Sequence, residues 1–544
     1  KQAIALKPDY AEAHSNLGNT LQELGRLNEA EASYTQAITL KPDFAEAHYN
    51  LGITLQELGR IDDAIKAYIQ ALKINPDYTE AYYNLGIALM GIGFRKPVHG
   101  LSELICKILA KKTLVRPNEI SEAAISLLKL DPMIKGAIAT YSAGELVQSL
   151  QEIIVSLSNF PLLLKLMEIS PIPDFEFESL FIDIRSAILL SISNIGNNSE
   201  ILGFQTALAL HCFTNEYLYD QADIEIEALE KLENLVGNKL TTGKQPTPTE
   251  LACLSSYKSL HEYAWIKLVT IPMELQELER RQIIEPEEEK QLRSNIPMLQ
   301  KINDNVSRKV QEQYEQNPYP RWVNTKLPFV PKPISLVTKE INLNIKDLCI
   351  NEISNPQILV AGCGTGQHSI TTAARFKDCD LLAIDLSLSS LSYAKRMTEE
   401  LGISNIEYMQ ADILDLGALN RQFDIIESAG VLHHMDDPMA GWEVLTGRLK
   451  AGGLMKIGLY SELARSDIVQ MRHEIQQFNA GSSNDAMKSF RKMVVNSKEA
   501  HHNMIALSPD FYSLSTFRDL LFHVQEHRFT IPKIKDCLAQ LGLT

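Results

Sequence analysis

Cysteine is scarce in this sequence, and its spacing matches no metal or redox motif. The seven cysteines among 544 residues are odd in number, scattered, and never arranged as C-x-x-C (Cys106, Cys212, Cys253, Cys349, Cys363, Cys379 and Cys537). This scarcity excludes a disulfide scaffold and a thiolate metal site. We therefore expect a reducing, cytoplasmic location and no bound metal.

Long hydrophobic runs and an excess of basic charge are also absent. No apolar run reaches the roughly 18 uncharged residues that a membrane-spanning helix needs, so we expect no membrane segment. Lysine and arginine number 52 against 68 acidic residues, which gives a formal net charge of −16. Because this charge repels a phosphate backbone, a nucleic-acid substrate is disfavoured.

The remaining composition is that of an ordinary multidomain globular protein. Hydrophobic residues make up 45% of the chain and charged residues 22%, which are typical values for folded domains. A chain of 544 residues is too long for one core, since a domain usually has about 100 to 200 residues. We interpret it as three domains, covering residues 1–93, 94–300 and 301–544.

Residues 1–93 repeat with a period of 34 residues. A Pro-Asp-aromatic turn recurs at Pro8, Pro42 and Pro76, and Asn-Leu-Gly follows each turn at the same distance. Paired amphipathic helices at this period are typical of tetratricopeptide repeats, so the segment resembles a tetratricopeptide solenoid. Because a repeat is already in progress at Lys1, we expect the natural N-terminus to lie upstream.

Small and large residues alternate in this array as the resemblance implies. Gly18, Gly52 and Gly86 are predicted to let the two helices of a repeat approach, while Tyr34 and Tyr68 are predicted to fill large apolar positions.

Asn16, Asn50 and Asn84 occupy the same position in successive repeats. The array most resembles those of glycosyltransferases that carry an asparagine on the concave face of each repeat. A ladder of side-chain amides can hydrogen-bond an extended peptide backbone without reading its sequence. The resemblance therefore implies recruitment of a protein or peptide. The alternative is that these asparagines only orient neighbouring helices, and the sequence favours neither reading.

Residues 94–300 show helical periodicity without a chemical motif. Apolar residues fall at 3.6-residue spacing in two stretches (Leu101, Leu104, Ile105, Ile108 and Leu109; Ile184, Ile188, Leu189 and Ile192). A polar turn at 243–248 and an acidic helix from Glu285 to Leu292 follow. This pattern predicts an all-α middle domain.

A glycine-rich loop follows a short apolar run at 358–361, which is typical of a buried parallel strand. The loop is Gly362, Cys363, Gly364, Thr365 and Gly366, and a helical segment comes next. Such a turn lets the backbone approach a ligand closely. In the dinucleotide fingerprint the third glycine falls three residues after the second, whereas here it falls two residues after. The shorter loop resembles motif I of class I methyltransferases.

The later elements arrive in the order that this resemblance requires. Strands are predicted at 381–385, 406–409, 423–428 and 455–460, alternating with helices. Residues from about Gln313 to Tyr460 resemble class I S-adenosylmethionine-dependent methyltransferases, which implies an α/β Rossmann-like, doubly wound sheet and S-adenosylmethionine as cofactor. A carboxylate that ends the second strand can accept hydrogen bonds from ribose hydroxyls. The residues implied to contact the cofactor, besides the loop, are Asp385, Leu386, Asp412, Ile413 and Ser428.

The segment before the first strand is aromatic and proline-rich, from Gln313 to Trp322. In many class I enzymes this segment lies over the cofactor, so Tyr314 and Tyr319 are predicted to wall the methyl-donor pocket. The alternative is a packed lid without a direct role.

His433 and His434 follow the fourth strand, at the edge of the sheet where an acceptor would arrive. A sulfonium methyl group is already activated, so the protein has mainly to align the acceptor, exclude water and, where needed, remove a proton. Imidazole is the side chain best suited to take that proton. The alternative is that the pair only caps the turn at 436–438.

A competing motif, H-x-x-E-H, lies at His523 to His527. On a helix these two imidazoles would share a face and could meet one zinc ion. Zinc sites usually take a third protein ligand, and Asp536 is the sole carboxylate side chain that remains downstream. We therefore favour Arg518, His523 and His527 as an acceptor-binding cap, or as helix-packing residues, over a zinc hydrolase.

The sequence after Tyr460 is helical in pattern and ends in a predicted helix from Ile534 that stops at Gly542. Class I sheets usually close with two further strands, so we expect the chain to stop before the sixth strand and to leave the fifth with an open edge. The leading hypothesis is methyl transfer to an unidentified acceptor, with the array recruiting a protein or peptide. The rival hypothesis is an adaptor whose cofactor domain is inactive.

Overall fold

The computed structural model describes residues 2–142, 146–195, 199–345, 348–478 and 481–543. The chain forms two compact units, one comprising Lys1–Leu180 with Val323–Lys326 and the other comprising Phe181–Trp322 with Leu327–Thr544. Among the described residues, no helix is both long and apolar enough to cross a membrane. The finer division into three domains stays a prediction.

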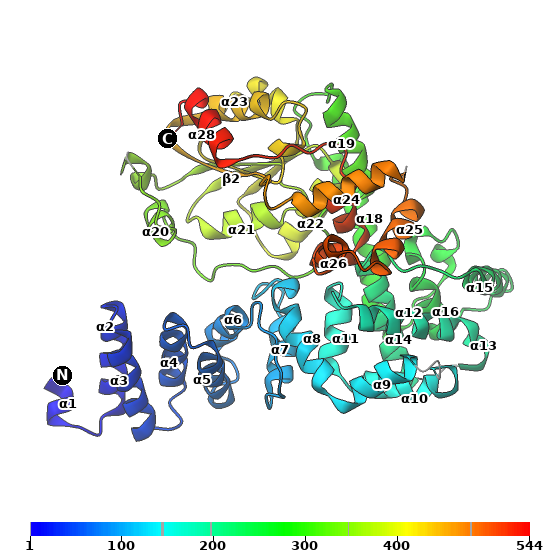
Figure 1. Ribbon diagram of the computed structural model, residues 1–544, viewed down its shortest axis with the longest axis horizontal. Helices are drawn as coiled ribbons and strands as arrows, with labels where there is room; N and C mark the ends of the chain where they lie inside the picture. Colours follow the sequence, from blue (N-terminus) through cyan, green and yellow to red (C-terminus); the bar gives the residue numbers. More distant parts are fainter. Residues whose placement is uncertain (1, 143–145, 196–198, 346–347, 479–480, 544) are drawn as a thin grey trace. The chain divides into compact units, whose positions relative to one another are not determined.

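The first unit begins with the predicted tetratricopeptide helices, drawn in blue in Figure 1. Gly18 and Gly52 allow close packing, because a Cβ atom there would lie 2.6 Å from the ring of Tyr34 or 2.5 Å from that of Tyr68. Both rings are fully buried, as the pattern of small and large residues predicts. The helices of this array are α1 (Gln2–Leu6), α2 (Ala11–Glu23), α3 (Leu27–Leu40), α4 (Ala45–Glu57), α5 (Ile61–Ile74) and α6 (Thr79–Ala88).

Helices also make up the rest of the first unit. The apolar residues predicted to share one face of residues 101–109 are all buried, which confirms the helical period there. The short segment Val323–Lys326 joins this unit, where the side-chain amide of Asn324 donates to the carbonyl of Leu109 (2.7 Å). The helices are α7 (Leu101–Ala110), α8 (Ser121–Leu130), α9 (Pro132–Ser142), α10 (Leu146–Ser158), α11 (Pro161–Ile169) and the start of α12 (Phe175–Leu190).

The second unit opens with a further helical segment. The predicted acidic helix is α18, and the predicted polar turn ends where Thr247 caps α16 by accepting a hydrogen bond from the Glu250 amide. The helices are α13 (Ile192–Ile195), α14 (Ser199–Thr214), α15 (Asp223–Thr241), α16 (Pro248–Ser255), α17 (Gln276–Glu279), α18 (Glu285–Leu292) and α19 (Asn305–Gln316).

A five-stranded parallel sheet follows, with the strand order β3-β2-β1-β4-β5. This order reverses direction at β1 and β4, so the carboxyl ends of these two strands flank the topological switch point at which α/β sheets bind ligands. The predicted doubly wound fold is confirmed. The strands are β1 (Gln357–Ala361), β2 (Asp380–Asp385), β3 (Ile406–Gln410), β4 (Phe423–Ala429) and β5 (Leu449–Gly458).

The predicted start of the fifth strand, at Met455, is wrong. The strand begins at Leu449, which pairs with Phe423, and the register then shifts before Ile425 pairs with Leu454. Residues Lys450–Gly453 pair irregularly, and their glycines suggest a turn. The sequence pattern therefore does not show that the strand already runs through them.

Helices cover both faces of the sheet, as Figure 1 shows. Alternate residues of each strand point to opposite faces, so Ile358 and Val360 pack on the side of α20, α21 and α22. Leu359 and Ala361 pack on the side of α23 and α28. The covering helices are α20 (Ile334–Glu340), α21 (Gln367–Arg375), α22 (Leu388–Glu400), α23 (Pro438–Arg448) and α28 (Ile531–Leu541).

The chain after β5 is mostly helical, as predicted, and its last helix is stopped by Gly542, whose backbone is left-handed. In the part of the chain that is described, β5 is an edge strand of the sheet, but Ser461 just beyond it pairs with Phe529. The helices before α28 are α24 (Ser466–Gln477), α25 (Asn484–Val495), α26 (Ala500–Ala506) and α27 (Leu514–Leu521).

The helical pattern expected after Tyr460 does not hold for His523 to His527. Helix α27 ends at Leu521, and the following segment is not helical. Its backbone is used elsewhere: the His527 amide donates to the carbonyl of His433 (2.7 Å), and the Phe529 amide donates to that of Tyr460 (2.8 Å). The backbone amides of this segment therefore bond to the segments that follow β4 and β5 and do not form the hydrogen bonds of a helix.

Replacing Gly52 with alanine should loosen the repeat array. The added Cβ atom would clash with the fully buried Tyr68 ring, and such overpacking costs about 1 to 3 kcal/mol. We expect faster hydrogen exchange of the amides in α4 and α5. Gly136→Ala in the exposed part of α9 is the matched control, because nothing lies within 4 Å of its added Cβ atom. Equal exchange in the two variants would contradict the packing role of Gly52.

Candidate functional site

The glycine loop joins the carboxyl end of β1 to α21 and is closely covered. Gly364 and Gly366 have φ angles of +52° and +87°, a region that residues other than glycine rarely adopt. A Cβ atom on Gly364 would lie 2.8 Å from the backbone oxygen of Tyr319, and one on Gly366 would lie 2.6 Å from the Cβ atom of Ala394. Only glycine fits these two positions.

Asp385, at the end of β2, is bonded to this loop. Its carboxylate accepts hydrogen bonds from the backbone amides of Gly364 (2.8 Å) and Ser387 (3.0 Å). Burial raises the pKa of Asp385, and these two bonds oppose the increase. A carboxylate has about four acceptor positions, so acceptor capacity remains for hydroxyl groups of a ligand. The carbonyl of the adjacent Leu386 accepts a hydrogen bond from the side-chain amide of Gln410 (2.8 Å).

Glu315 also belongs to this part of the site, although it was not predicted from the sequence. Its carboxylate accepts from the backbone amides of Leu388 (2.6 Å) and Ser389 (3.1 Å), at the first turn of α22. An acid at a helix N-terminus stabilises the exposed amides and the helix dipole. Glu315 therefore ties the segment before the sheet to the helix that follows Asp385. No local pattern shows this, since the partners lie more than 70 residues apart.

The other predicted cofactor residues are buried near the ends of the strands. Asp412 accepts from the Leu414 amide (3.1 Å), and burial raises the pKa of its carboxyl group. Ser428 donates to the carbonyl of Ala361 (3.0 Å), so it joins β4 to β1. Ile413 and Cys363 are buried. Burial also raises the pKa of the Cys363 thiol, so this cysteine is no nucleophile.

The segment before the first strand lies on the glycine loop. The indole of Trp322 donates to the carbonyl of Thr365 (3.1 Å), and the Thr365 hydroxyl donates to that of Pro320. The Tyr393 hydroxyl, from α22, donates to the carbonyl of Trp322. The segment therefore lies against the glycine loop, while its role in binding a cofactor stays a prediction.

A buried carboxylate supports the helix after the loop. Glu427 in β4 contacts His368 (2.7 Å) and accepts from the Thr372 hydroxyl (2.6 Å), both in α21. Burial alone would raise the pKa of Glu427, but His368 and the more distant Lys456 lower it to about 2. Glu427 therefore stays ionised and fixes α21 against the sheet. This contact, too, was not predicted from the sequence.

His433 is buried and packed on aromatic rings. Its ring stacks on that of Tyr460, with centroids 3.7 Å apart, and the Arg465 guanidinium lies 3.8 Å from the same tyrosine centroid. Neither ring nitrogen has a partner of good hydrogen-bond geometry in the described part of the chain. Burial, together with the neighbouring His434 and Arg465, lowers the pKa of His433 to about 2. Its imidazole is uncharged at neutral pH.

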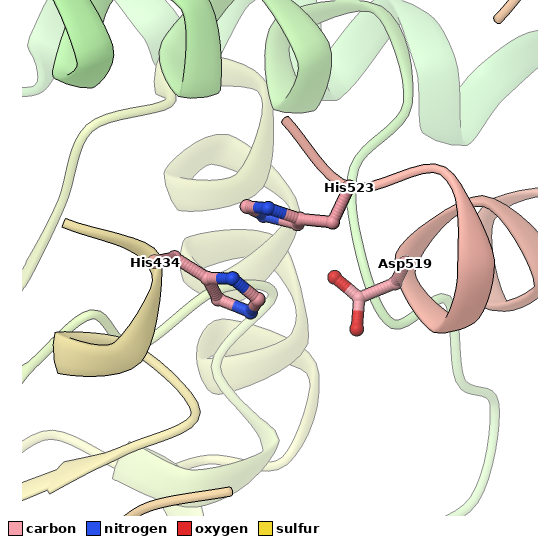
Figure 2. A group of neighbouring side chains, drawn as sticks. All are labelled: His434, Asp519 and His523. Carbon is pink, nitrogen blue, oxygen red and sulfur yellow. The ribbon is translucent and has the colours of Figure 1, made fainter. Parts of the chain in front are cut away.

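His434 and His523 come together with Asp519 from α27, as Figure 2 shows. The two imidazoles stack with centroids 3.5 Å apart, and Nδ1 of His434 donates to the carbonyl of Gln525 (2.6 Å). Burial lowers the pKa of His434 to about 4 and that of His523 well below its usual value. Burial raises the pKa of Asp519 to about 6.

Tyr314 completes this cluster. Its hydroxyl lies 2.7 Å from Asp519 Oδ1 and 3.1 Å from His523 Nε2. Its ring stacks with that of Tyr319 at a centroid distance of 6.3 Å. The structure thus brings Tyr314, Tyr319, His434 and His523 together, all of them predicted from the sequence, and adds Asp519, which was not predicted.

Arg518 and His527 lie apart from these contacts. The Arg518 guanidinium donates to the Ser482 carbonyl and the Asn484 side chain (both 2.6 Å) at the start of α25. The ring of His527 contacts the side-chain amide of Gln525 (3.2 Å). The first contact joins two helices, which is the packing alternative left open for Arg518.

The predicted peptide-binding asparagines differ from one another. Asn16 is exposed, whereas the Asn50 amide donates to the Asn19 side chain (3.0 Å) and the Asn84 amide donates to the Tyr49 hydroxyl (2.9 Å). The last two asparagines therefore join neighbouring repeats. Each amide keeps a carbonyl oxygen and a second N–H for other partners.

Comparison with known families agrees with both ends of the chain. The family model described as a methyltransferase domain matches residues 358–453. The model described as a TPR repeat matches residues 1–25, 19–59 and 55–93. The chain therefore contains a tetratricopeptide region and a methyltransferase domain, which implies S-adenosylmethionine as cofactor.

Individual relatives match parts of the chain. An uncharacterized protein of Synechococcus is 29% identical over 202 residues, covering 36% of this chain and 48% of that protein. The ubiquinone biosynthesis O-methyltransferase of Acinetobacter baylyi is 28% identical over 114 residues, covering 21% of this chain and 47% of that enzyme. The solved structure of PKMT2 from Rickettsia typhi is 19% identical, with a TM-score of 0.31, covering 40% of this chain and 44% of that one. The chain spans about half the length of the curated relatives described here.

Replacing Asp385 with alanine should weaken binding of S-adenosylmethionine by about 1 to 3 kcal/mol, because a charged acceptor is removed. Isothermal titration calorimetry on the full chain measures this loss. Asp380→Ala is the matched control, since Asp380 lies exposed at the other end of the same strand and its carboxylate accepts from the Gln357 side chain (2.8 Å), away from the loop. Equal affinities in the two variants would remove Asp385 from the cofactor site.

Replacing Gly364 with alanine should abolish cofactor binding. The new Cβ atom would collide with the Tyr319 carbonyl oxygen, which would displace the loop or the segment that covers it. Gly402→Ala carries a similar backbone strain, with φ at +68°, but has nothing within 4 Å. The same titration should therefore show binding in the Gly402 variant. Binding in the Gly364 variant would show that the loop does not hold the cofactor.

Proposed function

We propose that this chain, with its tetratricopeptide region and methyltransferase domain, transfers the methyl group of S-adenosylmethionine to an acceptor bound beside the cluster of Tyr314, His434, Asp519 and His523. One observation carries the proposal. The glycine loop, Asp385 and this cluster all lie at the carboxyl ends of parallel strands, where α/β sheets bind their ligands.

The cofactor would be held by the glycine loop and by two acids. In this proposal Asp385 accepts hydrogen bonds from the ribose hydroxyls, while Asp412 and Ile413 lie at the adenine. When bound, the cofactor supplies an activated sulfonium methyl group. The protein then has to align the acceptor and exclude water. The covering segment from Tyr319 to Trp322, fixed by the bonds of Thr365 and Trp322, supports the exclusion of water.

His433 and His434 are the proposed catalytic residues on the acceptor side. Their low pKa values keep both imidazoles uncharged at neutral pH, so neither repels the positive charge of a sulfonium group. The same low values make both rings weak proton acceptors. We assign them to lining and orienting the acceptor.

Tyr319 is proposed to wall the pocket beside Tyr314. Arg518 and His527 are proposed as residues of an acceptor-binding cap, with helix packing as the alternative. The bond from the Arg518 guanidinium to the start of α25 supports packing for Arg518. The three-domain division at residues 93 and 300 is part of the proposal, as is a cytoplasmic location, which the scarcity and scattered spacing of cysteine in the sequence support.

A second candidate is an adaptor whose cofactor domain is inactive. The two observations against it are the intact bond between Asp385 and Gly364 and the close cover of the loop by Tyr319. Neither the bond nor the cover of the loop would have to be kept in a domain that binds no cofactor. Calorimetric titration with S-adenosylmethionine separates the candidates, because no binding at millimolar ligand would favour the adaptor.

The array is proposed to deliver a protein or peptide acceptor through Asn16, Asn50 and Asn84. Replacing all three with alanine should leave the affinity for S-adenosylmethionine unchanged and reduce transfer of a labelled methyl group to a protein extract by at least about tenfold, a loss of about 1.4 kcal/mol of binding. Gln36→Ala with Gln70→Ala is the matched control, since both residues are exposed on the second helix of a repeat. Undiminished transfer in the asparagine variant would contradict this role of the array.

A further inference from the structure

We propose that Asp519, Tyr314 and His523 form a proton relay that takes up the proton lost by the methyl acceptor. The inference rests on the proposed function and names the group that serves it as base. Three separate elements supply the residues: Tyr314 comes from α19, Asp519 from α27 and His523 from the segment after α27. All three were brought together by the tertiary fold.

The tautomer of His523 follows from its contacts. Its Nδ1 lies 2.9 Å from the carbonyl oxygen of Gln525 and 3.3 Å from the backbone amide of the same residue. We assign the tautomer from the shorter contact. Because a carbonyl oxygen can only accept a hydrogen bond, Nδ1 carries the proton. Nε2 of the neutral ring is then an acceptor, and it faces the Tyr314 hydroxyl at 3.1 Å.

With Asp519 ionised, the cluster has one proton fewer than its hydrogen-bond contacts need. The Tyr314 hydroxyl has a single proton but lies within hydrogen-bond distance of two groups, Asp519 Oδ1 and His523 Nε2. If Asp519 is ionised, both neighbours are acceptors, and one of the two contacts has no proton. One added proton on Asp519 satisfies both contacts, since Asp519 then donates to Tyr314 and Tyr314 donates to His523.

This gives a balanced step for an acceptor X–H. A lone pair on X forms the bond to the methyl carbon, and the electrons of the carbon–sulfur bond stay on sulfur, which becomes a thioether. The proton on X passes to the Tyr314 oxygen while the Tyr314 proton moves to Asp519. The new Tyr314 hydroxyl then turns to His523 Nε2, so His523 is a positioning residue. Asp519 later returns its proton to solvent.

The electrostatic surroundings suit Asp519 for this task. Burial raises its pKa to about 6, the Tyr314 bond and the arginines lower it, and Glu526 raises it. A general base is most effective when its pKa lies near the working pH. The pKa values of His433 and His434, about 2 and about 4, lie further from neutrality. The titratable or charged groups that act on Asp519 or on its partners are Tyr319, His433, His434, Tyr460, Arg465, Arg472, Asp510 and Glu526.

The geometry favours a proton over a metal ion in this cluster. Ligand atoms of His434, Asp519 and His523 lie within 4.8 Å of one another (Figure 2). An imidazole binds a metal in its own ring plane, at about 2.0 to 2.1 Å. The rings of His434 and His523 are stacked 3.5 Å apart and inclined by 22°. Two such planes do not meet within bonding distance of both rings, so these imidazoles do not chelate one ion as they stand.

Infrared difference spectroscopy of the full chain tests the relay without an acceptor. The wild type should show the carbonyl band of a protonated carboxyl group that titrates near pH 6, and Asp519→Asn should lose it. Tyr314→Phe should move the midpoint to higher pH, because the Tyr314 bond lowers the pKa of Asp519. Tyr512→Phe is the control, since its buried hydroxyl bonds to the Ala506 carbonyl (3.1 Å) outside the cluster, and it should leave the midpoint unchanged.

Transfer of a labelled methyl group from S-adenosylmethionine to a protein extract gives the second readout. A base acts in its deprotonated form, so the wild-type rate should rise with pH through about 6 and then level off. Asp519→Asn should lose this rise, and Tyr314→Phe should lower the plateau by about 10² to 10⁴ fold. Asp519→Asn should keep the wild-type affinity for the cofactor, which also shows that this variant folds.

Two results would overturn the relay: an unchanged carboxyl band or pH profile in Asp519→Asn, or a tightly held divalent metal whose removal by a chelator changes the band. A different result would show that the proposed function fails. If the wild type binds no S-adenosylmethionine, the methyl-transfer proposal fails, while the infrared titration still reports whether Asp519, Tyr314 and His523 share a proton.

Discussion

A carboxylate and a backbone amide, 2.8 Å apart, fix the geometry on which the rest of the site depends: Asp385 accepts from Gly364. The bond joins the end of β2 to the loop that leaves β1, so two neighbouring strands share one polar edge. It also requires the backbone of the loop to turn through positive φ angles, which is why glycine stands at Gly364 and Gly366. A side chain on either residue would fill space that its neighbours already occupy.

The segment before the sheet depends on the same loop. Its backbone approaches Gly364 at Tyr319, and its indole at Trp322 bonds to the Thr365 carbonyl. Glu315 fixes the start of the segment to the first turn of α22. These contacts carry α19 and its Tyr314 to the carboxyl edge of the sheet. The aromatic cover and the cluster around Asp519 are therefore consequences of one close approach between backbones.

Burial shifts the pKa values of the histidines and of Asp519 in this site in opposite directions. It lowers the pKa values of His433, His434 and His523, and it raises that of Asp519. The histidines, which the sequence makes the obvious bases, become neutral packing and hydrogen-bonding groups. The carboxyl group becomes the one group in this cluster whose pKa lies near the working pH, because desolvation penalises the charged form of either kind of side chain.

The sequence by itself determined the features that short-range chemistry controls. The 34-residue period, the glycine loop and the acid at the end of the second strand each follow from local spacing and turn geometry, and the family matches and the sheet agree with them. Only the tertiary structure decided which groups meet. Tyr314 and Asp519 lie 205 positions apart, and His523 lies outside a helix because the segment that contains it bonds to the chain beyond β4 and β5. Such partners depend on the packing of whole elements, which no local pattern records.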